Sequence, residues 1–248
     1  MKLTYSIKGR GRDLVLLHGW GGSSKTIEPL ATSLSNQGFR VISIDWPGSG
    51  ETPIPKNSMY LKDYANLLIE TIVELKLVDP VFVGHSFGGK VILKTALMYP
   101  GVFKKMVLIA ASGIKPNNSL KKAIFKKISS GAKKITALPV LNKVEDKLRY
   151  SYYKYIVREM DYYRSEKLRE TFKNILDESL DDEINKIKVP TLIIWGDLDR
   201  MTPLWMGEKI KKLINKAEIK VFKGFGHGLP LVNPEPVSKV ISDFIKNQ

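Results

Sequence analysis

The stretch VFVGHSFGG, residues 81–89, decides the fold. Three apolar residues form a short strand-like run, and the pattern Gly-x-Ser-x-Gly follows with Ser86 at its centre. The residues after it have the pattern of a helix. A serine between a strand and a helix, flanked by glycines, is typical of a sharp turn that presents a nucleophilic hydroxyl above a sheet. Gly84 and Gly88 leave space where any side chain would clash.

Apolar runs and helical patterns alternate on both sides of this stretch. Besides the strand at 81–85, we expect strands at residues 3–7, 14–18, 40–45, 106–111, 190–196 and 218–222. Helices are expected at residues 24–36, 60–76, 86–99, 203–214 and 234–246. This alternation predicts an α/β fold, with a mostly parallel sheet and helices on both faces.

The alternation stops between residues 113 and 186. No strand-like run occurs there, and helical patterns are found at residues 120–136, 143–163 and 165–178. We therefore predict a core made of residues 1–112 and 187–248, interrupted by a helical insert at 113–186.

Positive charge is concentrated in this insert. The chain has a net charge of +15, and residues 113–158 contain 12 basic and two acidic side chains. Lysines outnumber arginines 32 to 8. Arginine is favoured for bidentate reading of bases and phosphates, so no nucleic-acid partner is predicted. The lysine-rich helix is expected to pack its apolar stripe on its neighbours; weak contact with an anionic membrane surface is the alternative.

Other features of the sequence exclude several classes of protein. The chain has no cysteine, so it has no disulfide, thiolate metal site or cysteine nucleophile. No apolar run approaches the length of a membrane-spanning helix. The first residues lack the apolar stretch of a secretory signal, so we expect a cytoplasmic protein.

A serine nucleophile needs a base, and the chain offers three histidines. His85 adjoins Ser86, but neighbours on a strand point to opposite faces, so it is poorly placed to accept the Ser86 proton. His18 ends a strand before a glycine-rich loop and is interpreted as structural. His227 follows the last expected strand, at the sheet edge where Ser86 also lies. His227 is therefore the predicted base.

The base needs a carboxylate to orient it. Asp197 and Asp199 both follow the strand at 190–196, and both precede His227 in the chain. Their position after the strand does not decide between them.

The sequence resembles the α/β-hydrolase superfamily over nearly its whole length. The resemblance rests on the motifs HGWGG (18–22), DWPGSG (45–50), GHSFGG (84–89), WGDLD (195–199) and GH (226–227). It implies a triad of Ser86, His227 and Asp199, since the family's acid usually stands three residues after the glycine that ends its strand. It also implies an oxyanion hole formed by the backbone N–H groups of Trp20 and Phe87, both of which could line the substrate pocket.

The resemblance implies further properties. The insert at 113–186 would be a helical cap over the active site, and the sheet should have about seven strands. No metal or cofactor is needed for such chemistry. Relatives that are dehalogenases or epoxide hydrolases carry aspartate at the position of Ser86, and dienelactone-type members carry cysteine there, so neither reaction is expected.

The predicted function is therefore that of a serine hydrolase. It would cleave a carboxylic ester-type bond of a small or lipid-like acyl substrate through an acyl-enzyme. The alternatives are a carbon–carbon bond hydrolase acting on vinylogous diketones, a lipase docked on a membrane surface, and a ligand receptor without catalysis on the same scaffold.

Overall fold

A seven-stranded sheet forms the centre of the chain in the computed structural model, which describes residues 1–115 and 165–247. The strands are β1 (Thr4–Lys8), β2 (Arg12–Leu17), β3 (Phe39–Asp45), β4 (Val81–His85), β5 (Met106–Ile109), β6 (Thr191–Gly196) and β7 (Ala217–Phe222). Their order across the sheet is β1-β3-β2-β4-β5-β6-β7. The strand that precedes Ser86 is therefore the central one.

All neighbouring strands run parallel except β1, which pairs antiparallel with β3. On β4, Gly84 is in register with Leu17 of β2, and His85 is in register with Ile109 of β5. Because the parallel strands end at the same edge, the loops that follow β2, β4, β6 and β7 come together there.

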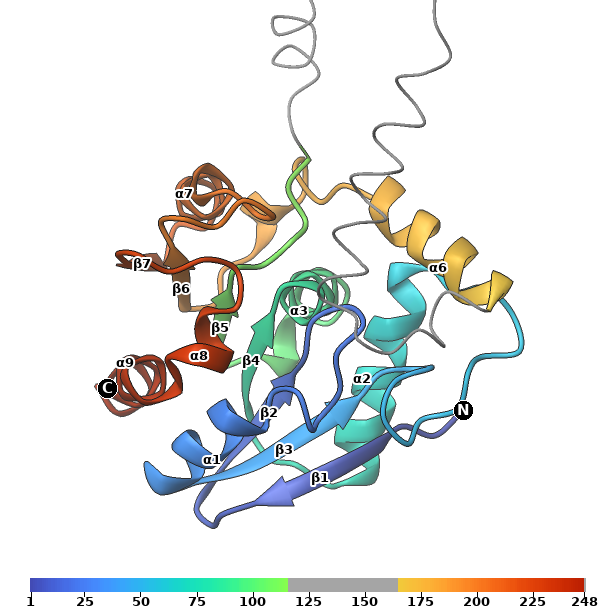
Figure 1. The fold of residues 1–248 in the computed structure, drawn as a ribbon, viewed down its shortest axis with the longest axis horizontal. Coiled ribbons are helices and arrows are strands. Elements are labelled where there is room, and N and C mark those ends of the chain that lie inside the picture. Colours follow the sequence, from blue (N-terminus) through green and yellow to red (C-terminus); the bar gives the residue numbers. More distant parts are fainter. Residues whose placement is uncertain (116–164, 248) are drawn as a thin grey trace, which may run out of the picture. The chain divides into compact units, whose positions relative to one another are not determined.

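Helices cover both faces of the sheet (Figure 1). They are α1 (Glu28–Asn36), α2 (Leu61–Glu74), α3 (Phe87–Met98), α6 (Glu166–Asp177), α7 (Leu204–Leu213), α8 (Leu229–Val232) and α9 (Pro234–Lys246), with short 3-10 helices η1 (Pro100–Val102) and η3 (Ile184–Lys186). Residues alternate along each strand between two buried cores. One core packs under α2, α3 and α7, and the other under α1 and α9.

The side chains of β2 alternate between the two cores. Leu14 and Leu16 face the core under α1 and α9, whereas Val15 and Leu17 face the core under α2, α3 and α7. All four side chains are fully buried. A strand covered on both faces needs apolar residues at every position, and this requirement explains the continuous apolar runs in the sequence.

The predicted fold class is confirmed, and the seven strands lie within two residues of the expected runs. The expected helix at 165–178 is α6, which forms one compact unit with the core residues. The expected helices at 120–136 and 143–163 lie outside the described residues, as does most of the lysine-rich segment. The division into a core and a cap at 113–186 stays a prediction.

Within residues 1–115 and 165–247, no helix is both long and apolar enough to cross a membrane.

Candidate active site

Ser86 lies on a strained turn between β4 and α3. Its backbone has φ 53° and ψ −111°, a conformation that side-chain-bearing residues rarely adopt. The turn is held by a hydrogen bond from the Ser86 N–H to the Ile109 carbonyl at 2.9 Å, and the Ser86 carbonyl accepts the N–H of Ser112 at 3.1 Å. These bonds fix Ser86 at the carboxyl edge of the central strand.

The glycines of this turn are required by close packing. A Cβ atom on Gly84 would lie 2.6 Å from the carbonyl carbon of Gly88, and one on Gly88 would lie 2.4 Å from the Leu17 carbonyl oxygen. Both distances are shorter than van der Waals contact, and both partners are backbone atoms that cannot turn aside. The sequence Gly-x-Ser-x-Gly therefore follows from the geometry of the turn itself.

Asp199 and His227 meet at the same edge of the sheet. Asp199 lies in the loop after β6 and His227 in the loop after β7, and Asp199 Oδ2 is 2.8 Å from His227 Nδ1. A carboxylate accepts, so Nδ1 carries the proton and Nε2 is left to accept one. The Asp199 side chain is fully buried, whereas that of His227 is 10% exposed.

The Asp199 carboxylate is kept ionised by its surroundings. Burial by itself would raise its pKa, but the hydrogen bond with His227, the charge of that ring and two backbone donors outweigh burial and hold the pKa below its usual value. The donors are the N–H groups of Met201 at 2.8 Å and Thr202 at 3.0 Å, both bound to Oδ1. One carboxylate oxygen thus anchors Asp199 to its own loop, and the other faces His227.

Asp197 has a different position. Its Oδ1 accepts the N–H of Gly224 at 2.7 Å, and the residue is exposed. It joins the loop after β6 to the loop that carries His227. The structure therefore brings Asp199, and not Asp197, into contact with the His227 ring.

Thr202 also belongs to this cluster. Its hydroxyl is 2.9 Å from Asp199 Oδ2, 3.0 Å from the Ala110 carbonyl oxygen and 3.2 Å from His227 Nδ1. Ala110, directly after β5, has a left-handed backbone with φ 46°. Its carbonyl thereby faces Thr202. The cluster at His227 is thus connected to β5 as well as to β6.

His85, the neighbour of Ser86 on β4, is buried and contacts His227. Its Nε2 is 2.9 Å from the carbonyl oxygen of His227, so that nitrogen carries a proton and donates it. The two imidazole rings are tilted by 43° with their centroids 4.8 Å apart. Burial and the neighbouring His227 lower the pKa of His85 to about 3, which keeps its ring neutral.

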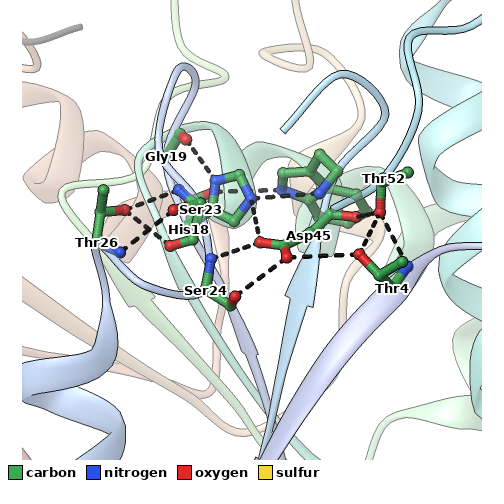
Figure 2. Close-up of polar contacts among 9 residues, drawn as sticks. Thr4, His18, Gly19, Ser23, Ser24, Thr26, Asp45 and Thr52 are labelled. Carbon is green, nitrogen blue, oxygen red and sulfur yellow. Dashed lines mark hydrogen bonds and ion pairs between the residues drawn. The ribbon is translucent and has the colours of Figure 1, made fainter. Parts of the chain in front are cut away.

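His18 fixes the loop after β2, as expected for a structural residue. Its Nδ1–H donates to the Gly19 carbonyl at 2.7 Å (Figure 2). Its Nε2 accepts the backbone N–H of Trp46 at 3.3 Å. Burial lowers the pKa of His18, in agreement with a neutral ring that donates at one nitrogen and accepts at the other.

Asp45 also binds this loop (Figure 2). This buried carboxylate accepts the Ser24 N–H at 2.5 Å through Oδ1 and the Ser24 hydroxyl at 3.1 Å through Oδ2. The Thr52 hydroxyl donates to the Asp45 carbonyl at 2.9 Å, and Thr52 also accepts the Thr4 N–H from β1. The loop of residues 18–24 is therefore tied to β3 and through it to the edge strand.

Trp20 and Phe87 occupy one aromatic cluster. Their ring centroids are 5.0 Å apart in an edge-to-face arrangement, and Tyr64 contacts Phe87 in the same way. Phe172 of α6 also packs against Trp20, with ring centroids 5.0 Å apart. The helix α6 thereby contacts the loop that follows β2.

A short turn sets the position of the Trp20 backbone. The Gly22 N–H binds the Gly19 carbonyl at 3.0 Å, and Gly21 has φ 72°. The N–H of Phe87 belongs to the first turn of α3, where helical N–H groups have no intrahelical acceptor. Both predicted oxyanion donors thus flank the edge at which Ser86 lies.

The structure does not bring all three predicted triad side chains into contact. Asp199 and His227 are hydrogen-bonded, but within the described part of the chain no hydrogen bond joins the Ser86 hydroxyl to His227. Long or unformed bonds of this kind are common in unliganded active sites and tighten when substrate binds.

Among residues 1–115 and 165–247, no group of three or more histidine, aspartate or glutamate side chains is arranged to hold a metal ion.

Sequence reasoning did not find His85 or Thr202 as members of the site. An aspartate side chain can bind a backbone N–H two residues further along the chain, but this holds for Asp197 as well as for Asp199. It therefore does not single out Thr202. His85 had no signal either, since the contact partner on its face of the strand comes from a loop 142 residues away.

Comparison with known proteins identifies the family of this chain. The sequence profile of the α/β-hydrolase fold family matches residues 14–234. The AB hydrolase superfamily protein YisY of Bacillus subtilis is 27% identical over 95% of this chain and 92% of its own length. The pimeloyl-acyl-carrier protein methyl ester esterase of Shewanella woodyi is 29% identical over 79% of this chain and 78% of its own length.

A solved structure has the same fold. The esterase from Exiguobacterium antarcticum superposes with a TM-score of 0.76 at 22% identity, covering 98% of this chain and 95% of that one. The family match spans most of the chain, from within β2 to the start of α9. The chain therefore belongs to the α/β-hydrolase family and is a hydrolase enzyme.

Proposed function

We propose that this enzyme cleaves a carboxylic ester-type bond of a small or lipid-like acyl substrate through a covalent acyl-enzyme. Ser86 is the nucleophile, His227 the base and Asp199 the acid that orients it. The observation that carries the proposal is the 2.8 Å bond between Asp199 and His227 at the sheet edge where the strained turn presents Ser86. The esterase activity in the name of the Shewanella woodyi relative supports the ester class.

In the first half of the reaction, the Ser86 hydroxyl oxygen attacks the carbonyl carbon of the substrate. Its proton passes to His227 Nε2, and the carbonyl oxygen becomes an oxyanion. The N–H groups of Trp20 and Phe87 stabilise that charge, assisted by the positive end of α3. The bond to the leaving alcohol then breaks, and the alcohol takes the proton from His227.

The second half repeats these steps with water. Water gives a proton to His227 and attacks the acyl carbon, and the bond to Ser86 breaks as the serine regains that proton. The carboxylic acid is released. Asp199 stabilises the imidazolium in both halves, and its second oxygen stays bound to the N–H groups of Met201 and Thr202. This anchoring limits the movement of the carboxylate during the reaction.

The proposal is tested by a fluorophosphonate that labels activated serines, followed by intact mass measurement. The wild-type protein is expected to gain one adduct, and Ser86→Ala none. Ser35→Ala, which removes a serine from the last turn of α1, serves as the matched control and should be labelled like wild type.

The substrate class is tested in parallel with p-nitrophenyl esters of increasing acyl length. Ser86→Ala should lower kcat by about four orders of magnitude or more. A folded wild-type protein that takes no adduct and hydrolyses no ester would contradict the proposal. Turnover of a vinylogous diketone with little ester hydrolysis would contradict the ester class and leave the triad in place.

A further inference from the structure

His85 takes no part in the mechanism proposed above, although it is directly adjacent to Ser86. It is a buried polar side chain, 7% exposed, at the last position of the central strand. A histidine at such a position needs a hydrogen-bonding partner, because burying an unpaired polar group is costly. Its partner is part of the catalytic machinery.

That partner is the main chain of the base. His85 Nε2 donates to the carbonyl oxygen of His227 at 2.9 Å. The bond passes directly from β4 to the loop after β7, although β5 and β6 lie between these strands in the sheet. The residue before the nucleophile is thereby bound to the residue that would take the nucleophile's proton.

The other nitrogen of His85 faces the loop after β2. A Cβ atom added to Gly19 would lie 3.3 Å from His85 Nδ1 and 3.2 Å from Ser86 Cβ. Gly19 directly precedes Trp20, whose backbone N–H is a predicted oxyanion donor. The imidazole of His85 therefore lies among three segments that must be correctly spaced: the turn at Ser86, the loop with Gly19 and the loop with His227.

We propose that His85 is a positioning residue, whose Nε2–H bond to the His227 carbonyl sets the distance between Ser86 and His227. This inference rests on the proposed function, since it assigns His85 a role in spacing that triad. The hydrogen bond would act by fixing the position and direction of the His227 backbone. A base displaced by about 1 Å can lose on the order of 100-fold in rate, so a single bond to its backbone can control turnover.

Packing alone would give His85 a different role, and two substitutions separate the two roles. His85→Leu fills the site with an apolar side chain and removes the donor. His85→Gln places an amide N–H close to the position of Nε2 and keeps the donor. If His85 only fills space, leucine should be the better replacement; if it positions His227, glutamine should be.

A control removes long-range bonds to carbonyls far from the site. Lys105, just before β5 at the opposite edge of the sheet, donates its Nζ to the Phe244 carbonyl at 2.7 Å and to the Ile245 carbonyl at 3.1 Å. Lys105→Met deletes both bonds between distant segments and leaves the edge with Ser86 unchanged. It measures what the loss of long-range bonds to carbonyls does through stability alone.

The experiment measures phosphonylation of Ser86 by a fluorophosphonate, kcat and KM for p-nitrophenyl butyrate, and Tm. His85→Leu is expected to lower kcat and the maximal phosphonylation rate by about 10- to 100-fold, with KM changed less than about threefold. His85→Gln should recover most of the loss. Lys105→Met should keep the wild-type kcat at a temperature well below its Tm.

Three results would overturn the proposal: a wild-type kcat in His85→Leu, no recovery in His85→Gln relative to His85→Leu, or an equal loss of kcat in Lys105→Met. Ser86→Ala is measured beside them. If wild type is labelled at Ser86 and His85→Leu is labelled at the same rate, only the role of His85 fails. If wild type is not labelled, the proposed function fails.

Discussion

Asp197 and Asp199 lie two residues apart in one loop, yet their carboxylates do different things. The backbone turn formed by Asp199 with the N–H groups of Met201 and Thr202 directs its second oxygen at His227. Asp197 binds the Gly224 N–H at the surface. The position of a carboxylate in this loop is thus determined by its local turn, and the two residues make a matched pair for mutation.

Asp199→Asn is expected to lower kcat about 10³- to 10⁴-fold, because the amide would favour the wrong tautomer of His227. Asp197→Asn should keep kcat within about threefold of wild type and lower the free energy of unfolding by about 1 kcal/mol at most. Steady-state ester hydrolysis and urea unfolding of both variants measure these effects. The reverse order of kcat losses would assign the acid to Asp197.

Tyr64 offers a prediction on stability. It is fully buried in the aromatic cluster, and within the described part of the chain its hydroxyl has no hydrogen-bond partner. Burial raises its pKa far above the usual value, so the group stays neutral. Tyr64→Phe removes an unsatisfied polar atom and should raise the free energy of unfolding by about 1 kcal/mol. Destabilisation of similar size in urea unfolding would show that the hydroxyl is satisfied in solution.

At the scale of elements, α6 is attached to the core by lysines of α3. Lys90 is buried and donates its Nζ to the carbonyls of Ile175 and Glu178, at the carboxyl end of α6. A positive charge is favourable at that end of a helix. Lys94, one turn further along α3, forms a 2.8 Å ion pair with Glu178 and is more exposed.

These two lysines should differ in their contribution to stability. Lys90→Met is expected to cost about 2 to 4 kcal/mol, because buried carbonyls lose a charged donor. Lys94→Met should cost less than about 1 kcal/mol, as is usual for partly exposed ion pairs. Urea unfolding of the two variants checks this difference. Equal costs would mean that the α6 carbonyls are satisfied without Lys90.

Most elements could be predicted because each buried strand requires a continuous apolar run. The position of β1 could not. It comes just before β2 in the chain, but β3 lies between them in the sheet. Three of the five β1 residues are exposed, so the strand has little apolar pattern that could indicate its partner. The four-residue helix α8 is also too short to have a recognisable period.

The candidate site was predictable where a reactive residue type stands just after a parallel strand. Ser86, His227 and the pair of aspartates follow from the ends of parallel strands, which must share one edge. Contacts that depend on loop conformation, such as the bond from His85 to the His227 carbonyl, could not be predicted. A strand pattern shows on which face a side chain lies, but not which loop covers that face.

At the scale of the whole molecule, two buried histidines should make stability depend on pH. The pKa of His85 is lowered to about 3, and that of His18 is lowered as well. Below the ordinary value of about 6.5, the unfolded chain binds protons at these residues that the folded chain does not. Stability is therefore complete above about pH 6.5 and falls as the pH decreases toward 3.

His85→Gln isolates one of these contributions. Between pH 7.5 and 5.5, His85 alone should lower the free energy of unfolding by about 1.4 kcal/mol, and the glutamine variant should lack this part of the decrease. Urea unfolding of both proteins at the two pH values measures it. The same pH dependence in both proteins would contradict the neutral, buried state of His85.

The strand order has a consequence for synthesis on the ribosome. Strands β4, β5, β6 and β7 join the sheet in chain order toward one edge, so the loop with His227 is added after all of them. At 5–20 residues per second, translation needs on the order of ten seconds to proceed from Ser86 to His227. During that interval the nascent chain carries the serine without its base. Under the proposed function, a partly translated chain is a latent enzyme, and hydrolysis begins only once the last strand has docked.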